Sequence, residues 1–277
     1  MHRKKELKVI RIPIPTPTLY PHTTTNCYLV GNEDECLLVD AGYDSEETKI
    51  NLNKAIAQHQ LAIPKKIILT HSHPDHALGV RQLTNWDAVV SFHKEEKSQT
   101  LEAIAPYKKI STLDDEDRMT IGGEQIIILH TPGHTPGHLG LYLPSSQILI
   151  AGDNIVAEGT TWIGPPDGDM TDYIQSLNRL KTLNISKIAP GHGNWVTKPY
   201  EQIEFVLSRR LFRESQIITL LKEHKQVTSR KLTEIIYESS IHPSVFNVAK
   251  LTIEAHLHKL VQEGVVDFIE PNYSLVV

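Results

Sequence analysis

The sequence contains little cysteine, has no long apolar run and shows no excess of positive charge. Only two cysteines, Cys27 and Cys36, occur in 277 residues, and they form no CxxC pair. This excludes a disulfide-rich secreted scaffold and favours a cytoplasmic protein. The apolar runs, such as residues 126–129, are far shorter than the roughly 18 residues that suggest a membrane-spanning helix. No apolar stretch follows the basic start of the chain, so we expect no signal peptide and no membrane partner.

The charge balance also limits the partners of this protein. Lys and Arg total 28 and Asp and Glu total 33, which gives a formal net charge of −5. The chain as a whole therefore does not attract nucleic acid or anionic lipid, although a local basic patch is compatible with these numbers. Hydrophobic residues make up 40% of the sequence, which is enough for a sizeable buried core.

Over residues 1–200, short apolar strands are interspersed with helical segments. We expect strands near residues 9–12, 26–30, 35–40, 65–70, 88–92, 125–129, 139–143, 147–151 and 187–190. We expect helices over 45–62, with Ser45 as the N-cap, and over 172–183. Many strands with helices between them predict sheet layers covered by helices, that is, an α/β sandwich domain over residues 1–200.

Residues 201–277 have a different pattern, which predicts a second domain of the winged-helix type. Three amphipathic helices are expected over 201–224, 229–238 and 244–263, followed by a hairpin with its turn at 270–272. A winged helix that reads DNA normally has a basic surface. Here nine basic and ten acidic residues nearly cancel. We therefore expect a role in packing, dimerisation or covering the substrate, and we consider duplex DNA an improbable partner.

The unusual feature is the histidine count of 15 and its concentration in one short segment. His71, His73, Asp75 and His76 lie within six residues, directly after a buried strand. Such crowding is costly for a loop that binds nothing, and imidazole and carboxylate are standard ligands of zinc and related divalent ions. This segment therefore predicts a metal site.

Three further candidate ligands follow other predicted strands, each in a glycine-containing turn: His134, Asp153 and His192. Only tertiary folding can bring them to the first segment. The seven groups divide into two sets of ligands, with His71, His73 and His134 on one ion and Asp75, His76 and His192 on the other. Asp153 bridges the two. We expect two Zn²⁺ ions, with Mn or Fe as alternatives, and a shared water that becomes hydroxide near neutral pH.

This set of motifs resembles the metallo-β-lactamase superfamily, whose pattern is HxHxDH followed by His, Asp and His. The resemblance covers residues 9 to 200, and every ligand position carries the expected residue type. Aspartate rather than cysteine at position 153 indicates the glyoxalase II-like and nuclease branches. The Ala151-Gly152-Asp153 turn and the C-terminal winged helix are similar to the β-lactamase-like protein 2 group. The resemblance implies an αββα sandwich, and that group includes a single-stranded RNA endonuclease.

From these observations we expect a dinuclear zinc hydrolase that uses a metal-bridging hydroxide and needs no serine or cysteine nucleophile. Asp75 is the candidate catalytic residue, as a ligand that also gives a proton to the leaving group. Three substrate classes stay open: single-stranded RNA is the first expectation, a small-molecule thioester or ester is the alternative, and a lactone or lactam comes third. A metal-sensing winged-helix regulator and an iron redox protein are alternatives, and a homodimer is compatible with the sequence.

Other polar residues have weaker patterns. Asp40 is expected to hold a loop or a ligand rather than to bind metal itself. His138 fits either a structural role or a contact near the site. His22, His93 and His130 fall in no recognisable pattern. Because loops usually lie at the surface, we expect replacement of His71 or Asp153 to spare the fold.

Overall fold

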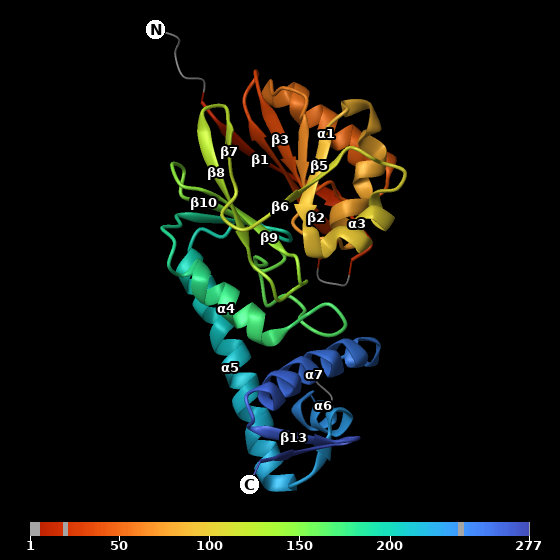
Figure 1. Ribbon diagram of the computed structural model, residues 1–277, viewed down its shortest axis with the longest axis vertical. Coiled ribbons are helices and arrows are strands. Elements are labelled where there is room, and N and C mark those ends of the chain that lie inside the picture. The colour runs from red at the N-terminus through yellow and green to blue at the C-terminus, as the bar shows by residue number, and fades with distance from the viewer. Residues whose placement is uncertain (1–5, 19–21, 238–240, 277) are drawn as a thin grey trace. The chain divides into compact units, whose positions relative to one another are not determined.

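The computed structural model describes residues 6–18, 22–237 and 241–276 (Figure 1). The basic start of the chain, on which the expectation about a signal peptide rests, lies mostly outside the described residues, as does the predicted helix end at Glu238. Among the described residues, no helix is both long and apolar enough to cross a membrane.

By its internal contacts the chain divides into two compact units. The first comprises Met1–Thr131, Gly137–Gly159 and Leu183–Pro199, and the second comprises Pro132–Pro136, Thr160–Thr182 and Tyr200–Val277. The predicted domain boundary at residue 200 stays a prediction. Each unit is described separately below.

A mixed six-stranded sheet forms one layer of the first unit. Its strands, in spatial order, are β1 (Lys8–Pro15), β2 (Thr24–Gly31), β3 (Cys36–Val39), β4 (Lys66–Ile68), β5 (Val89–His93) and β6 (Ile110–Leu113). β1, β2 and β3 are antiparallel neighbours, whereas β3 to β6 run parallel. The carboxyl ends of β3, β4 and β5 therefore lie at the same edge of the sheet.

A five-stranded sheet forms the second layer. In spatial order it contains β11 (Lys187–Pro190), β10 (Ile148–Gly152), β9 (Leu139–Leu143), β8 (Glu124–His130) and β7 (Arg118–Ile121). β10 and β11 are parallel, and the other pairs are antiparallel. The segments that follow β10 and β11 consequently leave the sheet side by side.

Apolar side chains from both sheets interlock between the layers. Val30, Val39 and Ile68 of the first sheet share one buried cluster with Ile128 and Leu141 of the second. The other face of the first sheet packs against helical elements, namely α1 (Glu46–His59), α2 (Pro74–Ala77), η1 (Leu78–Trp86) and α3 (Lys97–Ile104), and the short η2 (Lys94–Glu96) precedes α3. Both faces of the first sheet are thus buried, as a parallel sheet requires.

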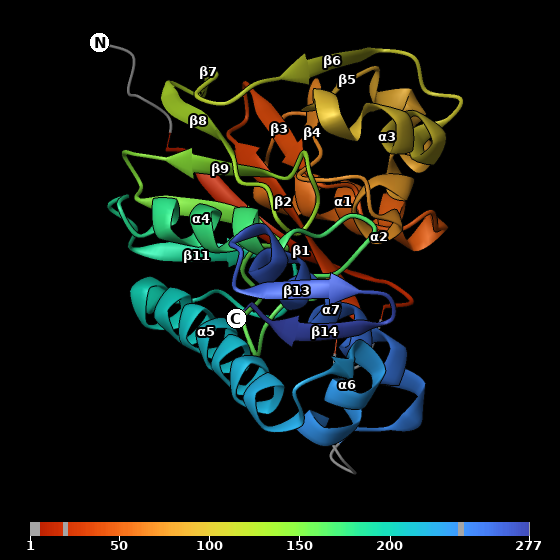
Figure 2. The ribbon, with the colours of Figure 1, turned by 60° about the horizontal axis from the view of Figure 1, so that its bottom comes forward.

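The second unit contains most of the remaining helices and a small sheet (Figure 2). Its elements are α4 (Met170–Leu180), α5 (Pro199–His224), β12 (Val227–Thr228), α6 (Ser229–Tyr237), η3 (Pro243–Val245), α7 (Phe246–Gln262), β13 (Val266–Ile269) and β14 (Asn272–Leu275). Ile217, Leu232, Leu257 and Val266 come from different elements and meet in one core. This is the predicted order of three helices and a hairpin, with β12 added at the edge of β14.

Local capping explains where two of the predicted helices begin. Ser45 accepts a hydrogen bond from the backbone N–H of Thr48 and caps α1, as predicted. Asp169 caps α4 in the same way through the N–H of Asp172. The sequence analysis missed α3, β6 and β7, which are short and, in the two strands, about half exposed. Such elements depend on tertiary contacts more than on a local apolar pattern.

Candidate metal centre

The histidine-rich segment follows the carboxyl end of β4 and leads into the short helix α2. His73 is the N-cap of α2, and Pro74 occupies its first position, where the missing N–H costs nothing. Asp75 and His76 lie in the first turn. His71 and His76 have no exposed surface. The expectation that His71 lies at the surface is therefore wrong, because its ring packs against those of His76 and His138.

Asp153 and His192 reach the same place from the parallel strands β10 and β11. Gly152 ends β10, and Gly191 follows β11. A Cβ atom on Gly191 would lie 2.0 Å from Oδ1 of Asp153, so only glycine permits this approach of the two turns. Asp153 and His192 are 7% and 6% exposed, and Asp153 is therefore also not at the surface.

Nitrogen and oxygen atoms of four candidate ligands converge at similar distances. Nε2 of His76 lies 3.5 Å from Oδ2 of Asp75 and 3.3 Å from Oδ1 of Asp153. Nε2 of His192 lies 3.4 Å from Oδ2 of Asp75 and 3.2 Å from Oδ2 of Asp153. These distances exceed those of charge-assisted hydrogen bonds. They match the roughly 3.4 Å that separates two ligands of one tetrahedral ion when each is about 2.0–2.1 Å from it.

Hydrogen bonds at the other ring nitrogens turn two imidazoles toward this point. Nδ1 of His76 donates to Oδ2 of Asp40 at 2.8 Å, and Nδ1 of His192 donates to the carbonyl of Thr24 at 2.9 Å. Each bond directs Nε2 toward the other candidate ligands, where it can bind a metal after losing its proton, which is the usual arrangement around ligating histidines. The donor set therefore fits a divalent metal ion.

His71 and His73 form a second pair of neighbouring donors. Nε2 of His71 lies 3.0 Å from Nδ1 of His73, and the hydroxyl of Thr70 lies 3.0 Å from Nδ1 of His71. His71 also joins His76 and Asp153 in a group whose ligand atoms all lie within 4.8 Å of one another, and Asp75, His76 and His192 form another such group. Asp153 thus connects the two pairs of histidines.

The carboxylates control the charge of the buried imidazoles. Burial disfavours the imidazolium form of His76, but Asp153, Asp75 and Asp40 outweigh it and hold the pKa of His76 well above its usual value. Burial also disfavours the imidazolium form of His192, but Asp153 outweighs it and raises the pKa of His192. Burial disfavours the ionised form of Asp153, yet His192 and His76 keep its pKa well below the usual value. Without metal, the cluster therefore retains protons.

His134, the remaining predicted ligand, lies in the loop Pro132–Pro136, which groups with the second unit. Within that unit its Nδ1 donates to the carbonyl of Trp162 at 2.9 Å, so its Nε2 is also oriented as a ligand atom. His134 is 3% exposed, and the surface-loop expectation does not hold here either. Its place on an ion stays a prediction.

Asp40 holds the histidine-rich segment, as the sequence suggested. Its Oδ1 accepts a hydrogen bond from the N–H of Thr70 at 2.8 Å, and its Oδ2 accepts one from the hydroxyl of Thr70 at 2.9 Å. Together with the bond to His76, this buried carboxylate fixes both ends of the segment. Its backbone φ of 57° lies in the left-handed region, which aspartate tolerates better than most residues.

The sequence left two roles open for His138, and its hydrogen bonds indicate the structural one. Its Nε2 accepts a hydrogen bond from the backbone N–H of Asp153 at 3.2 Å, while its Nδ1 lies 3.0 Å from the hydroxyl of Thr131. His138 is fully buried. It therefore fixes the turn that carries Asp153.

Two residues near the site, Glu96 and Thr25, escaped the sequence analysis, and a third, His22, was named there without a role. The buried carboxylate of Glu96 accepts hydrogen bonds from the N–H of Ser72 at 3.0 Å and of Gly137 at 2.9 Å. The hydroxyl of Thr25 donates to Oδ2 of Asp75 at 2.7 Å. The ring of His22 stacks on that of His192, with centroids 5.1 Å apart. All three are distant in sequence from their partners, and no local pattern reveals them.

A further group, formed by His93, Glu95 and His130, also has ligand atoms within 4.8 Å of one another. The rings of His93 and His130 stack with centroids 4.1 Å apart and planes only 13° apart. Parallel rings direct their in-plane lone pairs side by side rather than toward one point. This group therefore fits an ion less well than the centre around Asp153.

The comparisons with known proteins agree with this geometry. A family model described as "Metallo-beta-lactamase superfamily" matches residues 21–192, and one described as "Beta-lactamase associated winged helix domain" matches residues 228–271. The chain belongs to the metallo-beta-lactamase superfamily. The α/β fold and the winged-helix domain predicted from the sequence are thereby confirmed.

Relatives of this superfamily member include a beta-lactamase-like protein 2 homolog from Caenorhabditis elegans, 32% identical, covering 94% of this chain and 86% of the relative. An atrochrysone carboxyl ACP thioesterase from Aspergillus fumigatus is 25% identical, covering 78% and 65% of the two chains. With its His/Asp cluster, this superfamily member is a metal-dependent hydrolase.

Two solved structures are also similar. A metallo-beta-lactamase family protein from Thermus thermophilus has a TM-score of 0.81 at 24% identity, covers 97% of this chain and 98% of its own, and shows the shared fold. TTHA1623, solved in a di-iron-bound form, is 30% identical with a TM-score of 0.53, covering 66% and 94% of the two chains.

Proposed function

We propose that this protein is a dinuclear zinc hydrolase that cleaves small-molecule thioesters or esters. The proposal of two bound metal ions rests on the position of Asp153. One oxygen of its carboxylate lies 3.3 Å from Nε2 of His76, and the other lies 3.2 Å from Nε2 of His192. Both of these histidines belong to one proposed ligand set, and Asp153 also groups with His71, which belongs to the other set. A carboxylate placed in this way suits a bridge between two ions.

The proposed ligand sets follow from the residue groups. We propose that His71, His73 and His134 hold one ion, and that the other is held by Asp75, His76 and His192, whose ligand atoms all lie within 4.8 Å of one another. Zinc is the proposed metal because imidazole and carboxylate are its usual ligands in catalytic sites. The same donors suit iron and manganese, and the di-iron form of TTHA1623 makes iron the first alternative to test.

The chain itself offers no cysteine nucleophile. Burial raises the pKa of the Cys36 thiol to about 12, and it raises the pKa of Cys27 well above the usual value. Both thiols therefore stay protonated near neutral pH and are poor nucleophiles. Two divalent ions, when bound, supply a Lewis acid and a water with a lowered pKa, so that such a nucleophile is unnecessary.

Asp75 is the residue that we propose for proton transfer to the leaving group. Its Oδ2 accepts the hydrogen bond from the Thr25 hydroxyl at 2.7 Å. Its side chain is 17% exposed, more than those of His76, Asp153 and His192. Thr25 thus holds the carboxylate in place while leaving it accessible to a substrate.

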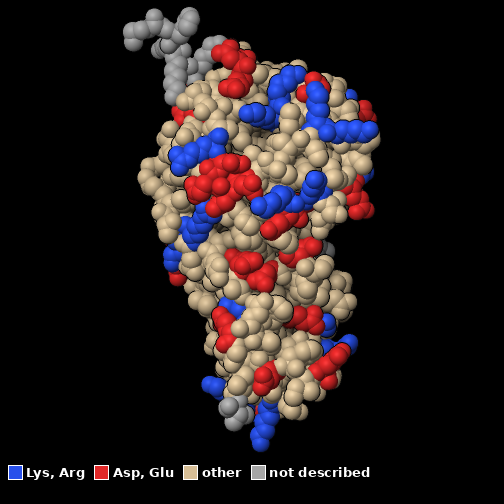
Figure 3. All heavy atoms as spheres, viewed as in Figure 1, with Lys and Arg blue, Asp and Glu red and all other residues tan. Residues whose placement is uncertain are grey.

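A thioester or ester fits the surface of the protein better than RNA does. Tight binding of a polyanion depends on several lysine and arginine contacts with phosphates. On the face shown in Figure 3, acidic and basic side chains are interspersed, and the chain carries a net charge of −5. The thioesterase name of the Aspergillus fumigatus relative supports the same substrate class.

The deciding experiment is a hydrolysis panel with the zinc-loaded protein. Thioesters of several acyl groups, an ester, a single-stranded RNA oligomer and a lactam are offered under the same conditions. We expect thioester cleavage that is lost in His71→Ala and retained in His224→Ala, a control at an exposed histidine of α5. RNA cleavage with intact thioesters would overturn the proposed substrate class and favour the endoribonuclease interpretation.

The non-enzymatic alternative has its own test. A winged-helix regulator would shift duplex DNA in a gel in a salt-dependent manner. The near balance of nine basic and ten acidic residues over 201–277 argues against it. The cytoplasmic location and the homodimer stay predictions.

A further inference from the structure

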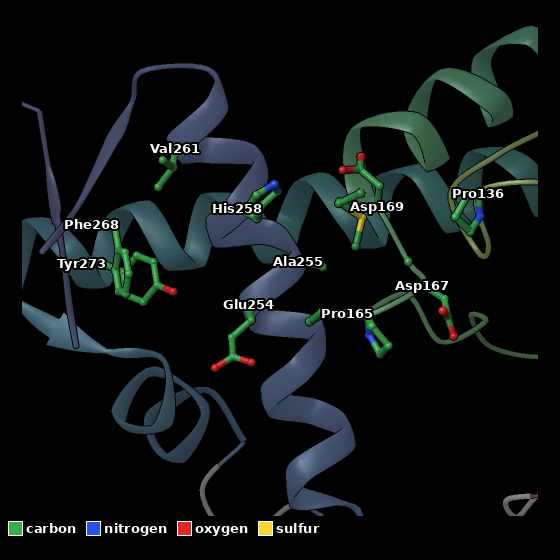
Figure 4. A pocket seen from close by; sticks show the side chains of 13 residues that line it. Pro136, Pro165, Asp167, Asp169, Glu254, Ala255, His258, Val261, Phe268 and Tyr273 are labelled. Carbon is green, nitrogen blue, oxygen red and sulfur yellow. The ribbon is translucent and has the colours of Figure 1, made fainter. Parts of the chain in front are cut away.

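The second unit contains a cavity of about 530 Å³ that is open to solvent on one side (Figure 4). Its wall is formed by the segment that leads into α4, by one face of α7 and by strands β13 and β14 of the hairpin. The volume falls within the range of about 300–1,000 Å³ that is typical of small-molecule sites. Nothing in the catalytic mechanism above uses this space.

Most of the cavity wall is apolar. Ala255 and Val261 of α7 line it together with Pro165. The rings of Phe268 and Tyr273 form a pair with centroids 4.6 Å apart, and Figure 4 shows them side by side at one end of the cavity. Phe268 is 48% exposed. About half of this aromatic side chain is exposed beside the cavity. An apolar ligand that covers it removes apolar surface from water, which favours binding.

The carboxylates at the cavity already have partners. Oε1 of Glu254 accepts hydrogen bonds from the hydroxyl of Ser229 at 2.8 Å and from Nζ of Lys250 at 2.6 Å. Asp169 caps α4 with its Oδ1. Asp167 also takes part in an interaction of its own. Because these charges are engaged, the cavity selects a neutral apolar group rather than a cation.

The cavity and a predicted metal ligand share one loop of this unit. Pro136 lines the cavity and follows His134 by two residues, so at most about 7 Å of backbone separates them. The carbonyl of Gly133 accepts a hydrogen bond from the N–H of Asp169 at 3.0 Å, and the carbonyl of Pro132 accepts one from Ser176 at 2.7 Å. The loop is therefore fixed to α4 beside the cavity.

We propose that this cavity binds the apolar acyl group of the substrate, with a preference for medium-length over short acyl chains. The proposal rests on the thioesterase or esterase function above, because only then does the substrate have an acyl group. Since Pro136 and His134 lie on the same fixed loop, an acyl group in the cavity places its carbonyl end near that predicted ligand.

Binding is measured apart from turnover. The zinc-loaded, full-length protein is titrated by calorimetry with amide analogues of acetyl, hexanoyl and decanoyl N-acetylcysteamine thioesters, in which NH replaces the sulfur. We expect the dissociation constant to fall with chain length by up to about fourfold for each buried methylene. A dissociation constant that is the same for the acetyl and decanoyl analogues would overturn the proposal.

Two variants and a matched control locate the binding. Phe268→Ser removes part of the wall and is expected to weaken binding of the decanoyl analogue about tenfold, with little effect on the acetyl analogue. Ala255→Phe fills the space from α7 and is expected to abolish the chain-length dependence. Ile269→Ser, a neighbouring residue of β13 that is 70% exposed and does not line the cavity, should leave it unchanged.

The outcomes separate this proposal from the function on which it rests. If Phe268→Ser and Ala255→Phe bind all analogues as Ile269→Ser does, the acyl group binds elsewhere and the proposal is wrong. The other case is that binding depends on chain length and this dependence is lost in the variants, but no thioester or ester is cleaved. Acyl binding in the cavity is then confirmed, and the proposed thioesterase or esterase function is wrong.

Discussion

Nδ1 of His76 donates a hydrogen bond of 2.8 Å to Oδ2 of Asp40, a carboxylate 36 residues earlier that also holds Thr70. Asp40 therefore acts through His76 rather than on an ion. Asp40→Asn tests this role, because asparagine tolerates the left-handed backbone but presents an N–H₂ group to at least one donor. We expect a roughly 10- to 100-fold weaker affinity for metal, measured by competition with a chelating dye.

A structural defect alone would give a different result for that variant. Asp267→Asn, at an exposed carboxylate of β13, serves as the control for a change of charge. An Asp40→Asn protein that melts at a lower temperature but binds zinc as tightly as the parent would show that Asp40 only stabilises the fold.

Glu96 connects the histidine-rich segment with the loop after β8. In Glu96→Gln, an amide N–H₂ must face the N–H of either Ser72 or Gly137, which leaves a buried donor unpaired. We expect a loss of about 1–3 kcal/mol in the free energy of unfolding, read from urea denaturation. Glu95→Gln, at the exposed neighbouring carboxylate, should be within about 0.5 kcal/mol of the parent. Equal effects of the two substitutions would contradict the role of Glu96.

Zinc binding is predicted to release protons. Burial disfavours the charged forms of His76 and His192, but the carboxylates around them raise both pKa values. Below these raised pKa values the metal-free site holds protons that an ion must displace, and above them it does not. Proton release per ion should therefore fall, and apparent affinity should rise, as the pH increases. Calorimetry in buffers of different ionisation enthalpy measures this, and constant release across the range would refute it.

The stability of the second unit should decrease in mild acid. His256 is fully buried, and this burial lowers its pKa from the ordinary value of 6.5 although Glu214 opposes the shift. Between the folded and the unfolded pKa of His256, this side chain is therefore protonated in the unfolded chain but not in the folded chain. Stability from this group is present above the unfolded pKa and is lost as the pH falls below it. His256→Leu should therefore lose less stability between about pH 7.5 and about pH 5.5 than the parent does.

Urea midpoints at the two pH values provide that measurement. His224→Leu, at an exposed histidine of α5, is the control for replacing a histidine by leucine. If the parent and His256→Leu lose the same stability on acidification, the acid sensitivity has another source.

Asp153→Asn separates the bridging role from simple packing. The substitution keeps the shape of the side chain but removes the charge that faces His76 and His192. We expect at least about a 100-fold loss of hydrolysis and a lower metal content by elemental analysis. A variant with two bound ions and full activity would show that Asp153 is not the bridge.

The sequence alone determined the chemistry of this protein and most of its elements. The crowding of His71, His73, Asp75 and His76 after one apolar strand indicated metal, because few other roles justify that cost. The 3.6-residue periodicity of 201–224 and the Ser45 cap predicted α5 and α1, since these signals are local.

Only the tertiary structure decided which residues support the ligands and how deeply they lie. The supporting hydrogen bonds of Asp40, Glu96, Thr25 and His138 span as many as 50 residues of sequence, and no periodicity marks such pairs. The rings of His73, His76 and His138 contact that of His71, which is fully buried. The cavity at Phe268 arises in the same way, because it requires α7, the hairpin and the segment before α4 to meet in space.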